Sequence, residues 1–173
     1  MEFFDLIQKR QSIRAYQDRQ VENEKIDHIL SATNAAPSAG NLQAYEIFLV
    51  SDKDQRAALA LAARSQDFIN QAPVVLVFCT HPARSEWRYH QRGVSLYTIQ
   101  DATIACTYAM LAAVDLGLGS VWVGAFNDEA VMEVLGNPPG LMAVAMLPIG
   151  YPAEEPPARP RRSLDELVHR LEH

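Results

Sequence analysis

One run of the sequence, residues 96–116, constrains the fold more than any other part of the chain. Its side chains are apolar on nearly every face that a helix would present. A helix that is apolar all round needs burial in a core or across a subunit interface. Gly117-Leu118-Gly119 follows, and a glycine at this place is typical of a helix C-cap. The rest of the chain must therefore cover a long apolar helix that ends before Leu118.

This Gly-x-Gly does not indicate a dinucleotide-binding loop. That fingerprint requires a strand before the glycines and a helix after them, and here the order is reversed. The length of 173 residues, with 49% hydrophobic and 21% charged residues, predicts a single domain over 1–173. No uninterrupted run reaches the roughly 20 apolar residues of a membrane span. Glu2 and Asp5 stand where a signal sequence would carry basic residues, so we expect a cytoplasmic protein without a membrane partner.

The charge distribution favours a small anionic ligand over a nucleic acid. The formal net charge is −6, whereas nucleic-acid binding depends on many contacts from lysine and arginine to phosphates. The basic residues nevertheless cluster at 9–14, 84–92 and 159–162. An acidic protein with concentrated basic patches suits a small anion better than a polymer.

The first basic cluster follows an amphipathic stretch, residues 1–9, whose apolar stripe we expect to pack on the core and to pin the segment after it. If that segment is extended, Arg10, Ser12 and Arg14 point to one side. The guanidinium fork of arginine suits a phosphate better than a lysine does. A solvated basic patch at a helix C-terminus is the alternative.

Periodicity and turn residues predict the remaining elements. A helix ending before Pro37 covers 26–33, and a turn-rich run of small residues follows at 35–43. Further helices are expected at 52–63 and 128–135 and strands at 46–50, 74–79, 120–126 and 143–149, while Ser163 and Glu166 form a capping box for a last helix.

Four further features of the sequence bear on the fold and on possible sites. Residues 81–93 form either a substrate lid or a surface loop with scattered aromatic side chains. His81 and His90 have no carboxylate or cysteine at ligand spacing, which argues against a metal site. Cys79 and Cys106 lie in apolar runs and are expected to be buried small hydrophobes. The alternation of helices and strands would by itself suggest a doubly wound parallel sheet.

Four motifs, taken in order, carry a resemblance to a known family. They are Arg10-Gln11-Ser12-Ile13-Arg14, Ala36-Pro37-Ser38-Ala39-Gly40-Asn41-Leu42-Gln43, residues 117–126 (GLGSVWVGAF), and Leu147-Pro148-Ile149-Gly150-Tyr151-Pro152 followed by Arg159-Pro160-Arg161. Each is weak alone, but their order and spacing resemble the nitroreductase-like family of FMN-dependent NAD(P)H oxidoreductases over nearly the whole chain. The resemblance implies an α+β fold with three αβα layers, in which helices flank a mixed central sheet.

The resemblance also implies where FMN binds. Arg10, Gln11, Ser12 and Arg14 would hold the phosphate and ribityl chain, and Arg159 and Arg161 would close on the same phosphate. The other residues that the family places near the flavin are Pro37, Ser38, Ala39 and Asn41 from the partner subunit of a homodimer, Gln66, and the strand end with Trp122, Gly124 and Ala125. The chain departs from the family pattern at Gln11, Ala39 and Ala44-Tyr45, and it is short for the family.

The implied chemistry belongs to the flavin, and the protein supplies placement and electrostatics. Hydride from NADH or NADPH would arrive at N5, beside a backbone N–H donor, and leave to an electron-poor acceptor such as a nitroaromatic, quinone, flavin or enone. Arg14 would stabilise the reduced ring, no side chain need act as acid or base, and turnover would be ping-pong. The alternatives are a non-catalytic flavin-binding or flavin-sequestering protein, and an interaction protein without cofactor.

Overall fold

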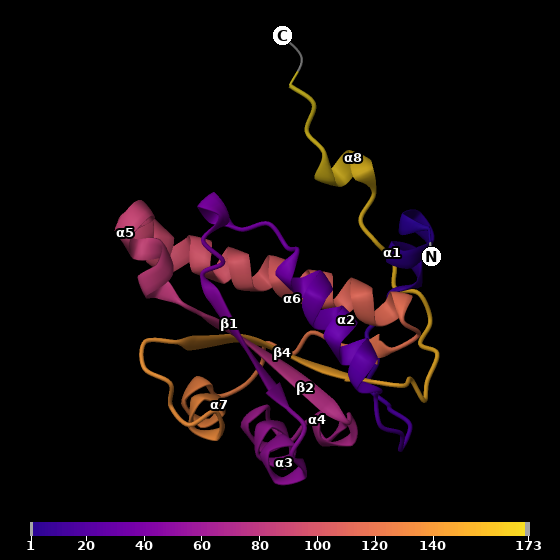
Figure 1. Cartoon of the computed structure of the whole chain (residues 1–173). Helices are drawn as coiled ribbons and strands as arrows, with labels where there is room; N and C mark the ends of the chain where they lie inside the picture. The colour runs from indigo at the N-terminus through magenta and orange to yellow at the C-terminus, as the bar shows by residue number, and fades with distance from the viewer. Residues whose placement is uncertain (1, 172–173) are drawn as a thin grey trace.

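The computed structural model describes residues 2–171, and Figure 1 shows a sheet lying between helices. The strands follow the order β1-β2-β4-β3, and all three pairings among them are antiparallel. The parallel component is a bridge between Ser12 and Ser120. The expected α+β class is therefore confirmed. The strand bounds are β1 (Tyr45–Val50), β2 (Val74–Thr80), β3 (Gly119–Ser120) and β4 (Met142–Gly150).

Strand β2 is the centre of the sheet because it is buried along its whole length. Alternate residues of a strand face opposite sides of a sheet. Leu76 and Phe78 accordingly belong to one hydrophobic core, while Val75 and Val77 belong to a second core on the other face. A strand that is apolar on both faces requires helices on both faces, and this requirement produces the three layers.

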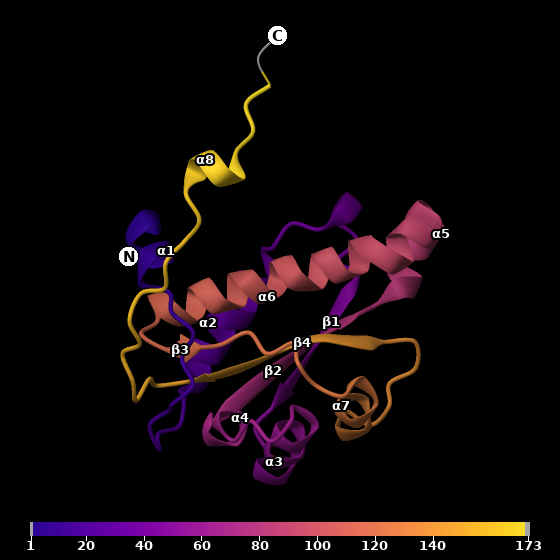
Figure 2. The same ribbon diagram turned by 180° about the vertical axis from the view of Figure 1, so that it is seen from behind.

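The first helical layer contains α2 (Asn23–Asn34) and α6 (Thr98–Asp115). Figures 1 and 2 show α6 crossing the sheet with α2 beside it. One side of α6 packs on the sheet, as the core alternative expects, while Tyr108 on another side remains 38% exposed. Within one chain, the helix is therefore not covered on every face. Its buried residues are Thr98, Asp101, Ala102, Ala105, Cys106, Ala109, Ala113 and Val114.

The opposite layer contains α3 (Lys53–Ala62), α4 (Phe68–Gln71) and α7 (Asp128–Val134). Two of these helices begin at side-chain caps. The Asp52 carboxylate accepts a hydrogen bond from the Gln55 amide at 2.9 Å, and the Asn127 side chain accepts one from Ala130 at 2.8 Å. Such caps satisfy amides that have no partner within the helix.

The prediction that residues 81–93 are irregular is wrong. Helix α5 (Pro82–Arg92) occupies this stretch, and a π-helical turn, η2 (Gly93–Tyr97), joins it to α6. Pro82 stands at the start, where its fixed φ suits a first helical turn. Neither glycine nor another proline interrupts the helix, although His90 departs from helical geometry with φ of 50°.

The strand expected at 120–126 is much shorter, and Pro148 gives the reason. The register pairs Ser120 with Ile149 and Val123 with Met146, which places Pro148 opposite Val121. Because proline has no N–H, the ladder cannot close there. The Pro148 carbonyl instead accepts a hydrogen bond from the hydroxyl of buried Tyr16, at 3.1 Å.

Both ends of the chain lie outside the layers. No residue of α1 (Phe3–Lys9) is buried, so the expectation that its apolar stripe packs on the core is wrong; Met1 lies outside the described residues. The capping box of Ser163 and Glu166 is confirmed, but α8 (Leu164–Leu167) is only four residues long. Figures 1 and 2 show α8 projecting from the body next to α1.

The two cysteines are buried and free, as expected. Burial raises the pKa of Cys79 to about 12, with a smaller contribution from the Glu46 carboxylate, and burial also raises the pKa of Cys106. Both thiols are therefore protonated at neutral pH. Among the described helices, none combines the length and the apolar character that crossing a membrane requires.

The Tyr16 hydroxyl is expected to stabilise the join between the N-terminal segment and β4. Its single proton is shared between the Pro148 carbonyl and the Ile13 carbonyl, which lies 2.8 Å away, and its pKa is raised by burial and by the Glu154 carboxylate, so it remains a donor. Tyr16→Phe should lower the free energy of unfolding by about 1–2 kcal/mol, because buried carbonyls lose their donor. Urea denaturation measures this, with exposed Tyr108→Phe as control. Equal stability of both variants would contradict the assignment.

Candidate functional site

Residues 12–17 are fixed in place by backbone pairing with two later parts of the chain. The Ile13 amide donates to the Ser120 carbonyl at 3.1 Å, and the Gln17 amide donates to the Tyr151 carbonyl at 2.9 Å. Ile13 is only 7% exposed, so it anchors this segment on the inside. Since neighbouring residues of an extended chain face opposite ways, Ser12 and Arg14 point away from Ile13.

A small basic cavity opens where this segment meets the C-terminal part of the chain. Its volume is about 240 Å³. Arg10, Ser12 and Arg14 line it from the N-terminal side, so the expectation that they share a side is confirmed. Arg159 and Arg161 line it from the other end of the chain. The complete lining is Arg10, Gln11, Ser12, Arg14, Pro156, Pro157, Arg159 and Arg161.

The electrostatics of this cavity suit a phosphate. Four guanidiniums surround a small volume in a protein with a formal charge of −6. The backbone amide of Arg14 donates a hydrogen bond to the Glu154 carboxylate. Guanidiniums donate two parallel hydrogen bonds to phosphate oxygens, and the Ser12 hydroxyl adds another possible donor. The arrangement can therefore hold a dianion.

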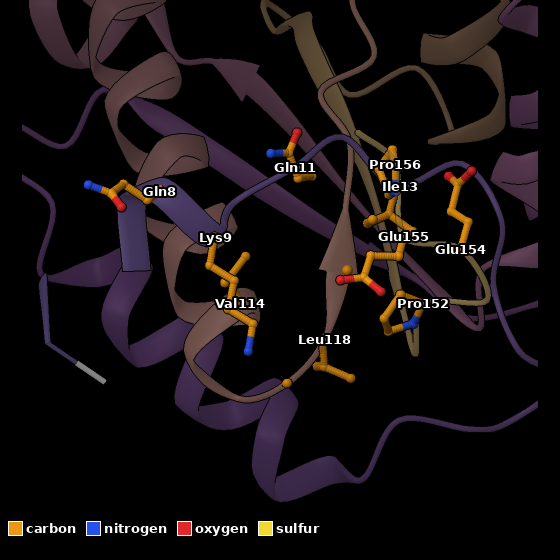
Figure 3. A pocket seen from close by; sticks show the side chains of 12 residues that line it. Gln8, Lys9, Gln11, Ile13, Val114, Leu118, Pro152, Glu154, Glu155 and Pro156 are labelled. Atoms are coloured by element: carbon orange, nitrogen blue, oxygen red, sulfur yellow. The ribbon is translucent and has the colours of Figure 1, made fainter. Parts of the chain in front are cut away.

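A second and larger cavity adjoins the basic one. Its volume is about 470 Å³, and Gln11 and Pro156 line both cavities. Figure 3 shows Lys9 beside Val114 on one side and Glu155 on another. Its walls mix apolar side chains with charges of both signs, so it lacks the uniform positive character of the basic cavity. The remaining lining residues are Gln8, Ile13, Gly117, Leu118, Gly119, Pro152 and Glu154.

The predicted residues of the 37–41 segment lie outside the basic cavity of their own chain. Pro37 and Asn41 are exposed, Ser38 and Ala39 are half-buried, and none of the four lines that cavity. The short helix η1 (Ala39–Asn41) forms the tip of the loop. Within one protomer, the structure does not bring this segment to the arginines.

Sequence reasoning missed the residue that holds this loop, Asp101. Its side chain is 2% exposed, and one carboxylate oxygen accepts a hydrogen bond from the Ala39 amide at 2.8 Å. Burial raises the pKa of Tyr45, and the Asp101 carboxylate raises it further. The available signal was an acidic residue in the first turn of a largely apolar helix, where a buried carboxylate requires a partner.

The other predicted residues occupy separate positions. Gly124 and Ala125 are exposed just after the bridge from Val123 to Met146, and the described residues accept no hydrogen bond from either amide. Gln66 lies between α3 and α4, and its side chain donates to the Ala63 carbonyl at 2.9 Å. Trp122 is half-buried against the first core. None of these four residues lines the basic cavity.

His81 has a carboxylate partner within the fold. His81 Nδ1 lies 2.7 Å from the Glu46 carboxylate, a partner that sequence reasoning did not identify. Across residues 2–171, no three His, Cys, Asp or Glu side chains are grouped as metal ligands.

Comparison with known proteins supports one family. The Nitroreductase family matches this chain over residues 7–66 and 60–151. FMN reductase [NAD(P)H] of Bacillus subtilis is 33% identical over 172 residues, which cover 91% of this chain and 69% of that protein.

Solved structures agree with this match. B. megaterium NfrA2 superposes with a TM-score of 0.90 at 30% identity, over 98% of this chain and 74% of that one. The NADPH:FMN oxidoreductase from Vibrio harveyi, complexed with NAD⁺, has a TM-score of 0.90 at 28% identity, over 98% of this chain and 77% of that one. The extent of the family match and the identity to the Bacillus subtilis protein lead to one conclusion: the chain belongs to the nitroreductase family.

Proposed function

We propose that the basic cavity holds the phosphate of FMN, and that the protein passes hydride from NADH or NADPH to an electron-poor acceptor. As a nitroreductase-family member, the protein is an NAD(P)H-dependent flavin oxidoreductase with FMN and NAD(P)H as its cofactors. Its relatives are named for FMN reductase, NADPH-flavin oxidoreductase and NADPH nitroreductase activities. These names favour a flavin or a nitroaromatic as acceptor for this chain, and quinones and enones are further candidates.

The observation that carries the proposal is the meeting of arginines from both chain ends around about 240 Å³. A phosphate group is small enough for such a volume and carries up to two negative charges, which the guanidiniums of Arg10, Arg159 and Arg161 can neutralise. A larger polyanion would need cationic side chains over a longer surface than this cavity provides. The donor set therefore fits the monophosphate of FMN.

The chain itself places and tunes the cofactor. Bound FMN supplies two-electron chemistry at N5, with NAD(P)H and acceptor alternating at one face in ping-pong order. Arg10 is assigned to the phosphate, while Arg14 is the candidate for stabilising negative charge on the reduced ring. The amides of Gly124 and Ala125 are candidates for the backbone donor near N5, because both residues are exposed. No side chain is required as a general acid or base.

Arginine variants test the phosphate assignment. Arg10→Ala and Arg161→Ala should each weaken FMN binding by about one to two decades, because a charge-assisted hydrogen bond contributes about 1.5–3 kcal/mol. Titration of the FMN-free protein with FMN, followed by flavin fluorescence, measures the change. Arg170→Ala is the matched control, since Arg170 is an exposed arginine of the same C-terminal segment that does not line the cavity.

Anaerobic addition of NADH or NADPH to the wild-type holoprotein tests the catalytic part. Loss of the flavin absorbance, and its return on adding an acceptor, is the expected result. Tight FMN that neither nucleotide can bleach would favour a flavin-binding or flavin-sequestering role instead. Unchanged FMN affinity in both arginine variants would contradict the phosphate assignment.

We also propose that the working unit is a homodimer whose flavin sites combine two chains. Large apolar side chains are exposed at both chain ends: Phe4 is 73% exposed and Leu164 is 74% exposed. One side of α6 is also left uncovered at Tyr108. These exposed apolar surfaces can together form an obligate interface, which commonly buries about 2,000 Å² or more. A partner chain could then bring its 37–41 segment to the flavin held by the arginines.

Sedimentation equilibrium tests the dimer. We expect a dimer at micromolar concentration, with association strengthened by FMN, because a ligand that binds only the assembled site stabilises assembly. The same experiment on the FMN-free protein provides the control. A monomer that carries a full complement of FMN would contradict the shared site.

A further inference from the structure

The loop at 38–44 has backbone dihedral angles that are unfavourable for residues other than glycine. Asn41 has φ of 58° and Gln43 has φ of 44°, and Gly40 between Ala39 and Asn41 also has positive φ. Residues other than glycine avoid this left-handed region because Cβ approaches the backbone. Such a conformation persists where surrounding contacts determine it. The contacts that hold this loop therefore decide how its tip is presented.

Asp101 of α6 binds the loop at both of its ends. One carboxylate oxygen accepts from the Ala39 amide at 2.8 Å, and the other accepts from the Ala44 amide at 3.4 Å. The Asp101 side chain therefore links the two ends of the loop, at residues 39 and 44. Because Asp101 is 2% exposed and lies in the long apolar helix, the loop is tied to the hydrophobic core instead of to another surface segment.

The other contacts of the loop act within it, from α5, or from the end of β2, where the His81 amide donates to the Ala44 carbonyl at 2.9 Å. The Ser38 hydroxyl accepts from the Gln43 amide at 3.0 Å, which closes the tip on itself. The Arg84 side chain donates to the Leu42 carbonyl at 3.0 Å from the exposed surface of α5. Within the described part of the chain, Asp101 is the side chain of α6 that hydrogen-bonds both ends of the loop.

We propose that Asp101 is a positioning residue: its carboxylate fixes the conformation in which residues 37–41 meet the flavin of the partner subunit. The inference rests on the proposed function. Its consequence is that the core of one protomer controls FMN binding in the site whose arginines belong to the other protomer.

Two substitutions separate the two hydrogen bonds. Asp101→Asn has nearly the same shape, keeps one acceptor oxygen and turns an N–H toward the second amide. Asp101→Ala removes both acceptors and leaves two amides without partners in a buried place. Thr98→Val is the matched control, because Thr98 is buried one turn earlier on α6 and bonds only the Val94 carbonyl.

Amide hydrogen exchange of the FMN-free protein gives a readout that does not depend on activity. In the wild type, the amides of Ala39 and Ala44 should exchange more slowly than that of Gly40. Asp101→Ala should accelerate exchange at both positions by about tenfold or more, whereas Thr98→Val should leave them unchanged. Wild-type amides at 39 and 44 that exchange as fast as Gly40 would overturn the anchoring, even if no variant folds.

FMN titration then tests the link to the cofactor. Asp101→Asn should raise the dissociation constant of FMN by about tenfold, the scale of one lost hydrogen bond, with Thr98→Val close to wild type. If Asp101→Asn binds FMN as wild type does while Arg10→Ala binds it weakly, the inference fails and the proposed function stands. If Arg10→Ala binds normally, the phosphate assignment itself fails.

A mixed dimer distinguishes positioning of the partner's flavin from simple damage to the variant's own chain. Asp101→Asn chains are paired with Arg10→Ala chains and the heterodimer is verified by mass. If the loop acts across the interface, one site carries both lesions and the other carries neither, so about half of the sites should bind FMN with wild-type affinity. A heterodimer in which every site is weakened would show that Asp101 acts within its own chain, and it would overturn the proposal.

Discussion

The arrangement of the candidate site depends on the pairing of residues 12–17 with two later segments, at Ser120 and at Tyr151. This pairing holds Ile13 and Tyr16 inside, and it thereby turns Arg10, Ser12 and Arg14 toward the C-terminal arginines. Four like charges would repel one another if nothing else brought them together. The cationic cavity is therefore built by backbone and apolar contacts made elsewhere, and its unfavourable self-energy favours an anion.

An irregularity in the sheet strengthens the same join. Pro148 has no N–H to offer β3, so the ladder between β3 and β4 is interrupted beside Val121. The free Pro148 carbonyl accepts the Tyr16 hydroxyl instead. The interruption therefore contributes to the site, since it joins the N-terminal segment to the central sheet. After Val123 the chain leaves β4, and Gly124 is exposed.

Local signals in the sequence predicted much of this fold. The apolar run of β2, the long apolar helix and the capping box at Ser163 each depend on neighbouring residues, and each was predicted correctly. Two of the errors arose where distant residues decide the outcome. The length of β3 depends on Pro148, far along the chain, and the apolar stripe of α1 finds no core within its own protomer.

The candidate site shows the same division. The arginines at the two ends could be predicted to converge because motif order resembled a known family, and the structure places them around one cavity. Asp101 could not be assigned a role, because an acid in the first turn of a largely apolar helix does not reveal which amides it will meet. The chemistry expected of residues 37–41 requires a second chain, and the contacts within one protomer give only the means by which that loop is held.

The central claim is that one phosphate is held by arginines from both ends of the chain. The most direct measurement is a crystal structure of the FMN-loaded protein, in which the phosphorus atom is located by its electron density. The account predicts phosphate oxygens within hydrogen-bonding distance of Arg10 and of at least one of Arg159 and Arg161. A phosphate bound elsewhere, with these guanidiniums facing solvent, would contradict it.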